Sequence, residues 1–339
     1  MLPFVQGQVA WPSGPVLFLR ARDGAALRQF PLSQLVCEQS FRPDAEALEH
    51  AGLQVIAEAS PSSSATRYPL VLVLPPRQRE EARALLARAV QLAAPGGIVV
   101  AGMTNNEGAK SGEADLKQLA GLAGTLTKFH CRTFWTRPLH EAADIALLEK
   151  WTSLDAPRRI EGGRFLSRPG VFAWNRIDPA SALLVEHLPA DIAGQGADLG
   201  AGYGYLSSEL LARCPKITAL DLYEAEARAL ALAETNLADS TSSATRQFLW
   251  HDVTRGLPAR YDFIVSNPPF HTQSRADRPD IGQRFISVAA EALKPGGRLW
   301  LVANRHLPYE QILNERFGDV RVAGERDGFK VIAAVKARR

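Results

Sequence analysis

Two sequence patterns, each of which occurs twice, constrain the fold of this chain more than any other feature. Residues 68–76 read Tyr-Pro-Leu-Val-Leu-Val-Leu-Pro-Pro, and residues 261–269 read Tyr-Asp-Phe-Ile-Val-Ser-Asn-Pro-Pro. In both places a helical pattern follows, then a Pro-Gly-Gly and another apolar run, at 95–100 and 295–302. Apolar runs that alternate with amphipathic stretches are typical of an α/β sheet. Long-range similarity in the same order indicates a duplicated domain, although any two segments of this kind resemble each other to some degree.

The two copies differ where a functional site would lie. Leu74 stands at the position of Asn267, and Arg77 stands at the position of the aromatic Phe270. The first half also has no glycine-rich turn before its Pro-Pro strand. We therefore expect the N-terminal copy to have lost its site and to serve in recognition or folding.

Size and composition suit two ordinary globular domains. The chain has 339 residues, of which 46% are apolar and 22% charged, and its net charge of +3 permits an anionic partner without demanding one. Cys37, Cys131 and Cys214 are isolated, which favours neither a disulfide framework nor a metal site. The N-terminus lacks the pattern of a signal peptide, and no apolar run is long enough to span a membrane. We expect a cytoplasmic protein.

Residues 151–168 interrupt the alternation and resemble a basic linker. Arginines and tryptophans gather in and just after this segment: Arg158, Arg159, Arg164, Arg168, Arg176, Trp151 and Trp174. Arginine can pair with phosphate, and an aromatic ring can stack on a base. A solvated linker is an equally good interpretation.

The stretch Asn267-Pro268-Pro269-Phe270 follows the apolar run 263–265, which predicts a buried strand. Ligands bind at the carboxyl ends of strands in open α/β sheets, so the Asn side chain is well placed to bind one. Its amide offers an acceptor and two donors to a planar amine, and Phe270 offers a stacking face. A simple turn residue is the alternative.

A glycine-rich turn supplies a second binding feature. Gly200, Gly202 and Gly204 follow the strand that ends near Asp198 and precede an amphipathic helix. The spacing departs from the dinucleotide pattern, whose third glycine comes three residues after the second. An acidic Asp198 would repel a pyrophosphate but attract an ammonium group. Both departures favour S-adenosylmethionine, whose amino acid end carries a cationic amine.

Two further carboxylates follow apparent strands. The run 217–220 ends at Asp221, where an acid can accept the ribose hydroxyls, and Leu222 and Tyr223 would flank the adenine. Asp252 follows the next strand and could accept from the adenine amino group, although it could equally be a helix N-cap. The turn, these two acids and Asn267 thus occupy four successive strand ends.

These motifs resemble those of a known family. The segments that carry the resemblance are 169–172 with Asp178, 198–204, 302–304 and Asn267-Pro268-Pro269-Phe270-His271. The chain resembles class I methyltransferases with an Asn-Pro-Pro-aromatic motif, and more narrowly the RsmC-type guanine-N2 methyltransferases of 16S rRNA. The resemblance covers nearly the whole chain.

This resemblance implies a fold of two tandem Rossmann-like methyltransferase domains. Residues 1–150 would be the degenerate copy, 151–168 the linker and 169–339 the catalytic domain. The catalytic domain would have a seven-stranded, mostly parallel sheet with an antiparallel last strand, and residues 321–323 and 330–335 would form its tail. The implied reaction is methyl transfer from S-adenosylmethionine to the N2 amine of a guanosine in 16S rRNA. The sequence does not fix the oligomeric state, and we expect a monomer.

The resemblance also implies roles for individual residues. Asn267, Pro268 and Phe270 would be catalytic, and Pro269, Phe270, His271 and Arg305 would contact the substrate. The cofactor would contact Asp198, Gly200, Gly202, Gly204, Asp221, Leu222, Asp252 and Asn267.

Three alternatives remain at this point. Arg305-His306 after Val-Ala-Asn also resembles the RlmG-type guanine-N2 methyltransferases of 23S rRNA. Protein glutamine methyltransferases use a similar Asn-Pro-Pro-aromatic motif, and a non-catalytic RNA-binding assembly factor is the third alternative.

Overall fold

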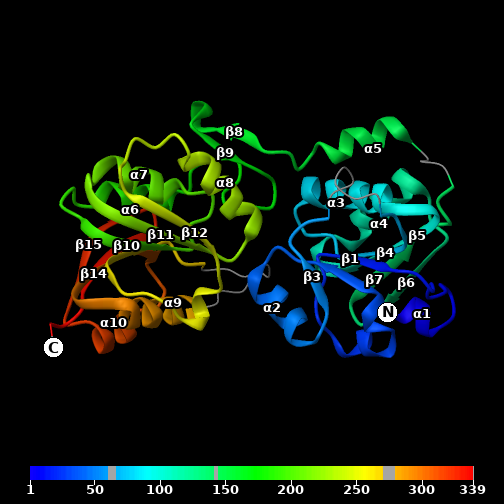
Figure 1. Cartoon of the computed structure of the whole chain (residues 1–339), viewed down its shortest axis with the longest axis horizontal. Helices are drawn as coiled ribbons and strands as arrows, with labels where there is room; N and C mark the ends of the chain where they lie inside the picture. The colour runs from blue at the N-terminus through cyan, green and yellow to red at the C-terminus, as the bar shows by residue number, and fades with distance from the viewer. Residues whose placement is uncertain (60–65, 141–143, 270–278, 339) are drawn as a thin grey trace. The chain divides into compact units, whose positions relative to one another are not determined.

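The computed structural model describes residues 1–59, 66–140, 144–269 and 279–338. The chain divides into two compact units. Unit 1 comprises Met1–Pro157 and Arg168–Gly170, and unit 2 comprises Arg158–Ser167 and Val171–Arg339. Figure 1 shows that each unit has its own sheet covered by helices.

Unit 1 is built on seven strands in the order β3-β2-β1-β4-β5-β7-β6. Neighbours pair in parallel except at β7, which is antiparallel to β5 and β6. The strands are β1 (Val16–Leu19), β2 (Leu35–Glu38), β3 (Gln54–Ile56), β4 (Tyr68–Val73), β5 (Ala93–Thr104), β6 (Gly124–Lys128) and β7 (Cys131–Trp135). The helices are α1 (Leu2–Val5), α2 (Arg42–His50), α3 (Arg79–Leu92), α4 (Ala109–Ala120) and α5 (Ile145–Thr152).

Unit 2 repeats this order as β12-β11-β10-β13-β14-β16-β15, with β16 antiparallel to β14 and β15. The strands are β10 (Ala193–Leu199), β11 (Lys216–Glu224), β12 (Thr245–Trp250), β13 (Tyr261–Ser266), β14 (Leu293–Asn304), β15 (Asp319–Arg326) and β16 (Phe329–Val335). The helices are α6 (Pro179–His187), α7 (Tyr205–Arg213), α8 (Ala227–Leu237), α9 (Pro279–Ala292) and α10 (Glu310–Arg316). The predicted pair of methyltransferase-like α/β sheets is confirmed.

The Pro-Gly-Gly of each unit adopts the same geometry. Gly96 and Gly296 both have a φ of +77°. A Cβ atom on Gly97 or Gly297 would lie 2.8 or 2.9 Å from the carbonyl oxygen three residues earlier. Each motif therefore needs both glycines near the start of its strand, where the pairing register of β5 or β14 shifts.

Apolar residues cover both faces of the unit 2 sheet. Leu184, Leu210 and Leu237 pack α6, α7 and α8 on one face, where they surround Leu220 and Val265. Residues of α9 and α10 pack on the other face, around Ile264 and Leu301. Figure 1 shows these two helical layers on either side of the strands. In a parallel sheet covered on both faces, the strand ends are where polar side chains can face solvent.

The segment interpreted as a basic linker contains regular structure. Residues 151–168 include the end of α5 and a hairpin of β8 (Arg158–Ile160) and β9 (Phe165–Ser167). Phe165 is buried against Tyr203 and Leu232 in unit 2. No helix in the described ranges is long and apolar enough to cross a bilayer.

Candidate active site

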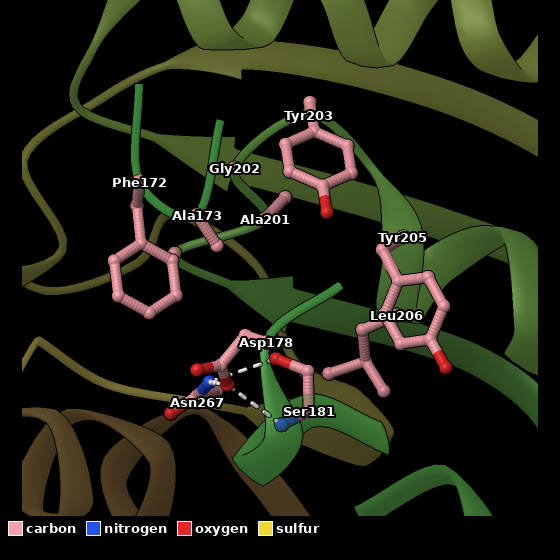
Figure 2. A pocket seen from close by; sticks show the side chains of 11 residues that line it. Phe172, Ala173, Asp178, Ser181, Ala201, Gly202, Tyr203, Tyr205, Leu206 and Asn267 are labelled. Atoms are coloured by element: carbon pink, nitrogen blue, oxygen red, sulfur yellow. Dashed lines mark hydrogen bonds between the residues drawn. The ribbon is translucent and has the colours of Figure 1, made fainter. Parts of the chain in front are cut away.

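A pocket lies at the carboxyl ends of β10 and β13 in unit 2. Its wall combines the loop before α6, the glycine turn after β10 and Asn267. Figure 2 shows Phe172, Tyr203 and Asn267 around it. The position agrees with the expected edge of the sheet.

The three glycines of the turn share a backbone conformation, but Gly202 and Gly204 differ in their surroundings. All have positive φ angles: +77° at Gly200, +57° at Gly202 and +87° at Gly204. A Cβ atom on Gly204 would lie 3.1 Å from Ala233 Cβ in α8. At Gly202 no atom lies within 4 Å of such a Cβ. Gly204 therefore allows close packing of α7 on α8, whereas Gly202 leaves open space beside the turn.

Asp198 is buried below this turn, and the residue is 1% exposed. Its Oδ2 accepts a hydrogen bond from Ser207 Oγ at 2.7 Å, while its buried Oδ1 has no partner among the described residues. Burial raises the pKa of this carboxyl to about 7, although the Ser207 hydrogen bond acts in the opposite direction. An unused buried acceptor of this kind fits a cationic amine.

The prediction that β11 ends at Asp221 was wrong, because the strand continues to Glu224. Leu222 and Tyr223 pair with Asp198 and Leu199 and are buried, and the helix that follows begins at Ala227. Tyr261 Oη donates to Asp221 Oδ2 at 2.7 Å and accepts from the Tyr223 hydroxyl at 2.6 Å.

Asp221 therefore lies within the strand, and its side chain is engaged with Tyr261. Leu222 is fully buried in the core and belongs to the cluster that packs α6, α7 and α8. Neither residue lines the pocket, and their contacts with the cofactor stay predictions.

Glu224 holds the strand-end position that was assigned to Asp221. Its Oε2 accepts from Gly202 N at 2.7 Å, and its Oε1 accepts from Glu226 N at 2.8 Å. Burial raises the pKa of this carboxyl. The apolar pair that follows Asp221 was the sequence signal that the strand continues.

Asp252 is the N-cap of a 3-10 helix, Val253–Arg255. Its Oδ1 accepts from Thr254 N at 2.9 Å and from Thr254 Oγ1 at 2.7 Å. The Asp252 side chain is 11% exposed. The capping alternative is thus observed, and a contact of Oδ2 with adenine stays a prediction.

Asn267 follows β13, and both hydrogens of its amide are used. Nδ2 donates to Asp178 Oδ2 at 2.9 Å and to Ser181 Oγ at 2.8 Å. Its Oδ1 is buried and has no partner in the described part of the chain. Pro268 is buried and Pro269 is exposed. Asn267 thus presents an unused acceptor beside the pocket.

The remaining predicted substrate residues divide into two groups. Phe270 and His271 lie outside the described residues. Arg305 follows β14 on the same edge of the sheet as Asn267, with a side chain 68% exposed and 3.9 Å from Glu325.

The structure also reveals site residues that we did not assign from the sequence. Phe172 is 65% exposed at the pocket, and Ala173 beside it has a φ of +51°. Asp178 and Ser181 reach Asn267 from the start of α6. An Asp followed by Pro179 is a typical helix start, but this signal does not reveal the partner.

The basic cluster is largely engaged within each unit. Trp151 is buried beneath the Arg83 guanidinium, which excludes it from base stacking. Arg168 pairs with Asp155, and Arg164 pairs with Glu209.

In unit 1 the equivalent site has been replaced. Strand register and the repeat place Phe18, Arg20, Gln39 and Leu74 at the positions of Asp198, Gly200, Glu224 and Asn267. Arg20 Nη1 donates to the carbonyl of Leu74 at 3.2 Å, across the ends of β1 and β4. At these four positions unit 1 therefore lacks the two acids, the glycine and the Asn267 amide of unit 2.

Comparison with known proteins gives a consistent result. Residues 162–333 match the methyltransferase small domain family. Relatives named ribosomal RNA small subunit methyltransferase C include those of Psychromonas ingrahamii, 28% identical over 80% of this chain and 76% of the relative, and Shewanella pealeana, 32% identical over 79% and 78%. The solved T. thermophilus 16S rRNA N2 G1207 methyltransferase, in complex with AdoMet and guanosine, is 27% identical with a TM-score of 0.78. That match covers 97% of this chain and 90% of the solved one.

Proposed function

This chain belongs to the methyltransferase small domain family, and on that premise we propose that it methylates the exocyclic N2 amine of a guanosine in 16S rRNA, with S-adenosylmethionine as methyl donor. The observation that carries the proposal is the Asn267 amide. Its hydrogens are engaged, and its buried Oδ1 is left as an acceptor at the strand edge. An acceptor in that position suits an amine with N–H groups to donate.

The residues of the glycine turn fit the cofactor. When bound, S-adenosylmethionine supplies a methyl group activated by a sulfonium centre. We assign its ammonium group to Asp198 Oδ1, the buried acceptor without a described partner. Glu224 would accept from the ribose hydroxyls, and Asp252 from the adenine amino group. Gly200 and Gly202 would let the backbone approach the cofactor closely.

The target nitrogen is a poor nucleophile because its lone pair is delocalised into the guanine ring. Asn267 Oδ1 and the Pro268 carbonyl would accept its two N–H bonds and aim the lone pair at the methyl group. The same acceptors stabilise the positive charge that grows on the nitrogen during transfer. No strong base is required, because the nitrogen becomes acidic only after methylation, and His271 could take the proton.

The guanine must leave its stack to reach this edge. Phe270 would stack on the base, and Pro269 would contact it. Arg305 would pair with a neighbouring phosphate, as an exposed guanidinium at the sheet edge can. We place the enzyme in the cytoplasm as a monomer, and the arginines of the β8–β9 hairpin are candidates for further RNA contacts.

Transfer of labelled methyl groups to RNA tests the function. Free 16S rRNA, free 23S rRNA and the two ribosomal subunits are each incubated with enzyme and labelled cofactor. We expect N2-methylguanosine in 16S rRNA, identified by nucleoside mass spectrometry. Label in 23S rRNA alone would instead indicate a guanine-N2 methyltransferase of 23S rRNA. Label in protein alone would indicate a protein glutamine methyltransferase.

Asn267→Ala is the variant that tests the site itself. Removal of the acceptor should lower the turnover number by about 100-fold or more, as loss of a transition-state hydrogen bond does elsewhere. Cofactor affinity, measured by calorimetry, should stay within about twofold, since the amide would contact the amine. Near-normal methyl incorporation by this variant would remove Asn267 from the reaction.

A further inference from the structure

The side-chain amide of Asn267 is held by two residues of a distant segment, and we propose that Asp178 and Ser181 are positioning residues for methyl transfer. The inference rests on the proposed function, because it concerns the amide that would receive the target amine. Figure 2 shows both side chains next to Asn267 at the start of α6.

The chemistry of the partners fixes which end of the amide faces them. A carboxylate can only accept hydrogen bonds, so the nitrogen of Asn267 must face Asp178. The second hydrogen on Nδ2 goes to Ser181 Oγ at 2.8 Å. The two ends of an amide have nearly the same shape, so these partners decide the orientation. Oδ1 is thereby directed away from Asp178.

Asp178 is itself fixed by the helix that it precedes. Its Oδ2 accepts from Ser181 N at 2.8 Å, which is the geometry of an N-cap, and Pro179 occupies the first helical position. Asp178 Oδ2 therefore accepts hydrogen bonds from both Ser181 N in the first turn of α6 and Nδ2 of Asn267. The start of this helix sets the orientation of a side chain 89 residues away in the sequence.

If Oδ1 and Nδ2 of Asn267 exchanged places, the contacts with both Asp178 and the target amine would be unfavourable. Oδ1 would face the Asp178 carboxylate, and Nδ2 would present a donor to the N–H groups of the target amine. In the observed orientation, donation to a charged acceptor also polarises the amide and strengthens Oδ1 as an acceptor. The two residues thus act through Asn267 and need no contact with the substrate.

Asp178→Ser separates positioning from helix capping. Serine is nearly as good an N-cap as aspartate, but its short side chain cannot serve both the helix and the amide. We expect the turnover number to fall roughly 10- to 100-fold, with the melting temperature within a few degrees and the KM for the cofactor within about twofold. The matched control is Asp144→Ser at the N-cap of α5, where Asp144 accepts from Leu147 N at 2.8 Å. This control should leave turnover unchanged.

A double-variant cycle decides whether Asp178 acts through Asn267. Asp178→Ser should cause no further loss of turnover in the Asn267→Ala background, measured over long incubations with labelled cofactor. Ser181→Ala should lower turnover, and Ser181→Thr, which keeps the hydroxyl, should restore it.

Each contrary outcome is distinct. The positioning role would be overturned if Asp178→Ser lowers turnover equally in the wild-type and Asn267→Ala proteins. It would also be overturned if the single variant Asp178→Ser has normal turnover. The proposed function would stand in both cases. A wild-type protein that methylates neither rRNA would overturn both.

Discussion

At the scale of single residues, Glu224 and Asp221 make contrasting predictions. Glu224 lies at the end of β11 and accepts from Gly202 N, whereas Asp221 accepts from a tyrosine inside the sheet. Glu224→Gln should weaken binding of S-adenosylmethionine by tenfold or more, which corresponds to at least about 1.4 kcal/mol. Asp221→Asn keeps an acceptor for Tyr261 and should change the dissociation constant by less than about twofold. Calorimetry on both variants tests which substitution weakens cofactor binding more. A greater loss of affinity in Asp221→Asn would return the ribose hydroxyls to Asp221.

If Asp198 binds the ammonium group as proposed, cofactor affinity should depend on pH. Its carboxyl has a pKa of about 7 in the free protein, because burial disfavours the carboxylate. A bound ammonium group favours the carboxylate and lowers that pKa, so affinity should rise as the pH increases from about 5.5 to 7.5. Asp198→Asn should remove this slope. Dissociation constants measured across that range provide the test, and a flat wild-type profile would exclude the ion pair.

The same carboxyl affects the stability of the free protein with the opposite trend. Its pKa is raised above the ordinary aspartate value of 3.8, so the folded state binds the proton more tightly than the unfolded state. Its favourable contribution is complete below about pH 4 and is lost as the pH rises to about 7.

At the scale of elements, the turn between β10 and α7 depends on packing as well as on conformation. Gly204→Ala places a Cβ atom 3.1 Å from both Ala233 Cβ and Leu237 Cδ1, at a φ of +87°. The clash and the backbone strain together should cost about 2 to 4 kcal/mol. Gly202→Ala is the matched control, because it adds strain in open space and should cost only about 1 to 2 kcal/mol. Urea unfolding of the two variants measures how much each substitution lowers the free energy of unfolding of unit 2. Equal losses in Gly204→Ala and Gly202→Ala would contradict the packing role of Gly204.

Much of the element order could be predicted, because apolar runs and Pro-Gly-Gly turns are local signals. The end of β11 was misplaced, because Asp221 looks like a strand boundary although the apolar pair Leu222-Tyr223 continues the strand. The contact between Asp178 and Asn267 was also out of reach, because it joins positions far apart in the sequence. Local patterns thus gave the edge of the sheet, whereas the partners that orient Asn267 depend on how α6 packs in the folded unit.

At the scale of the whole molecule, the two sheets share one topology, but their described strand ends carry different side chains. Duplication preserved the strand order and the Pro-Gly-Gly geometry. At the strand ends of unit 1, however, Phe18 replaces an acid, Arg20 replaces a glycine and Leu74 replaces the amide. Unit 1 therefore keeps the shape of the sheet without the groups to which we assign the methyl donor.

This difference predicts one cofactor per chain. The Arg20 guanidinium bonds to the carbonyl of Leu74 across the strand ends that would have to admit the ligand in unit 1. Titration calorimetry on the full chain should give a stoichiometry of one, and Glu224→Gln should weaken that single event without revealing a second. A stoichiometry of two would show that unit 1 binds S-adenosylmethionine by groups other than those of unit 2. Arg20→Gly with Leu74→Asn should still leave one site, because Phe18 in β1 provides no acceptor for the ammonium group.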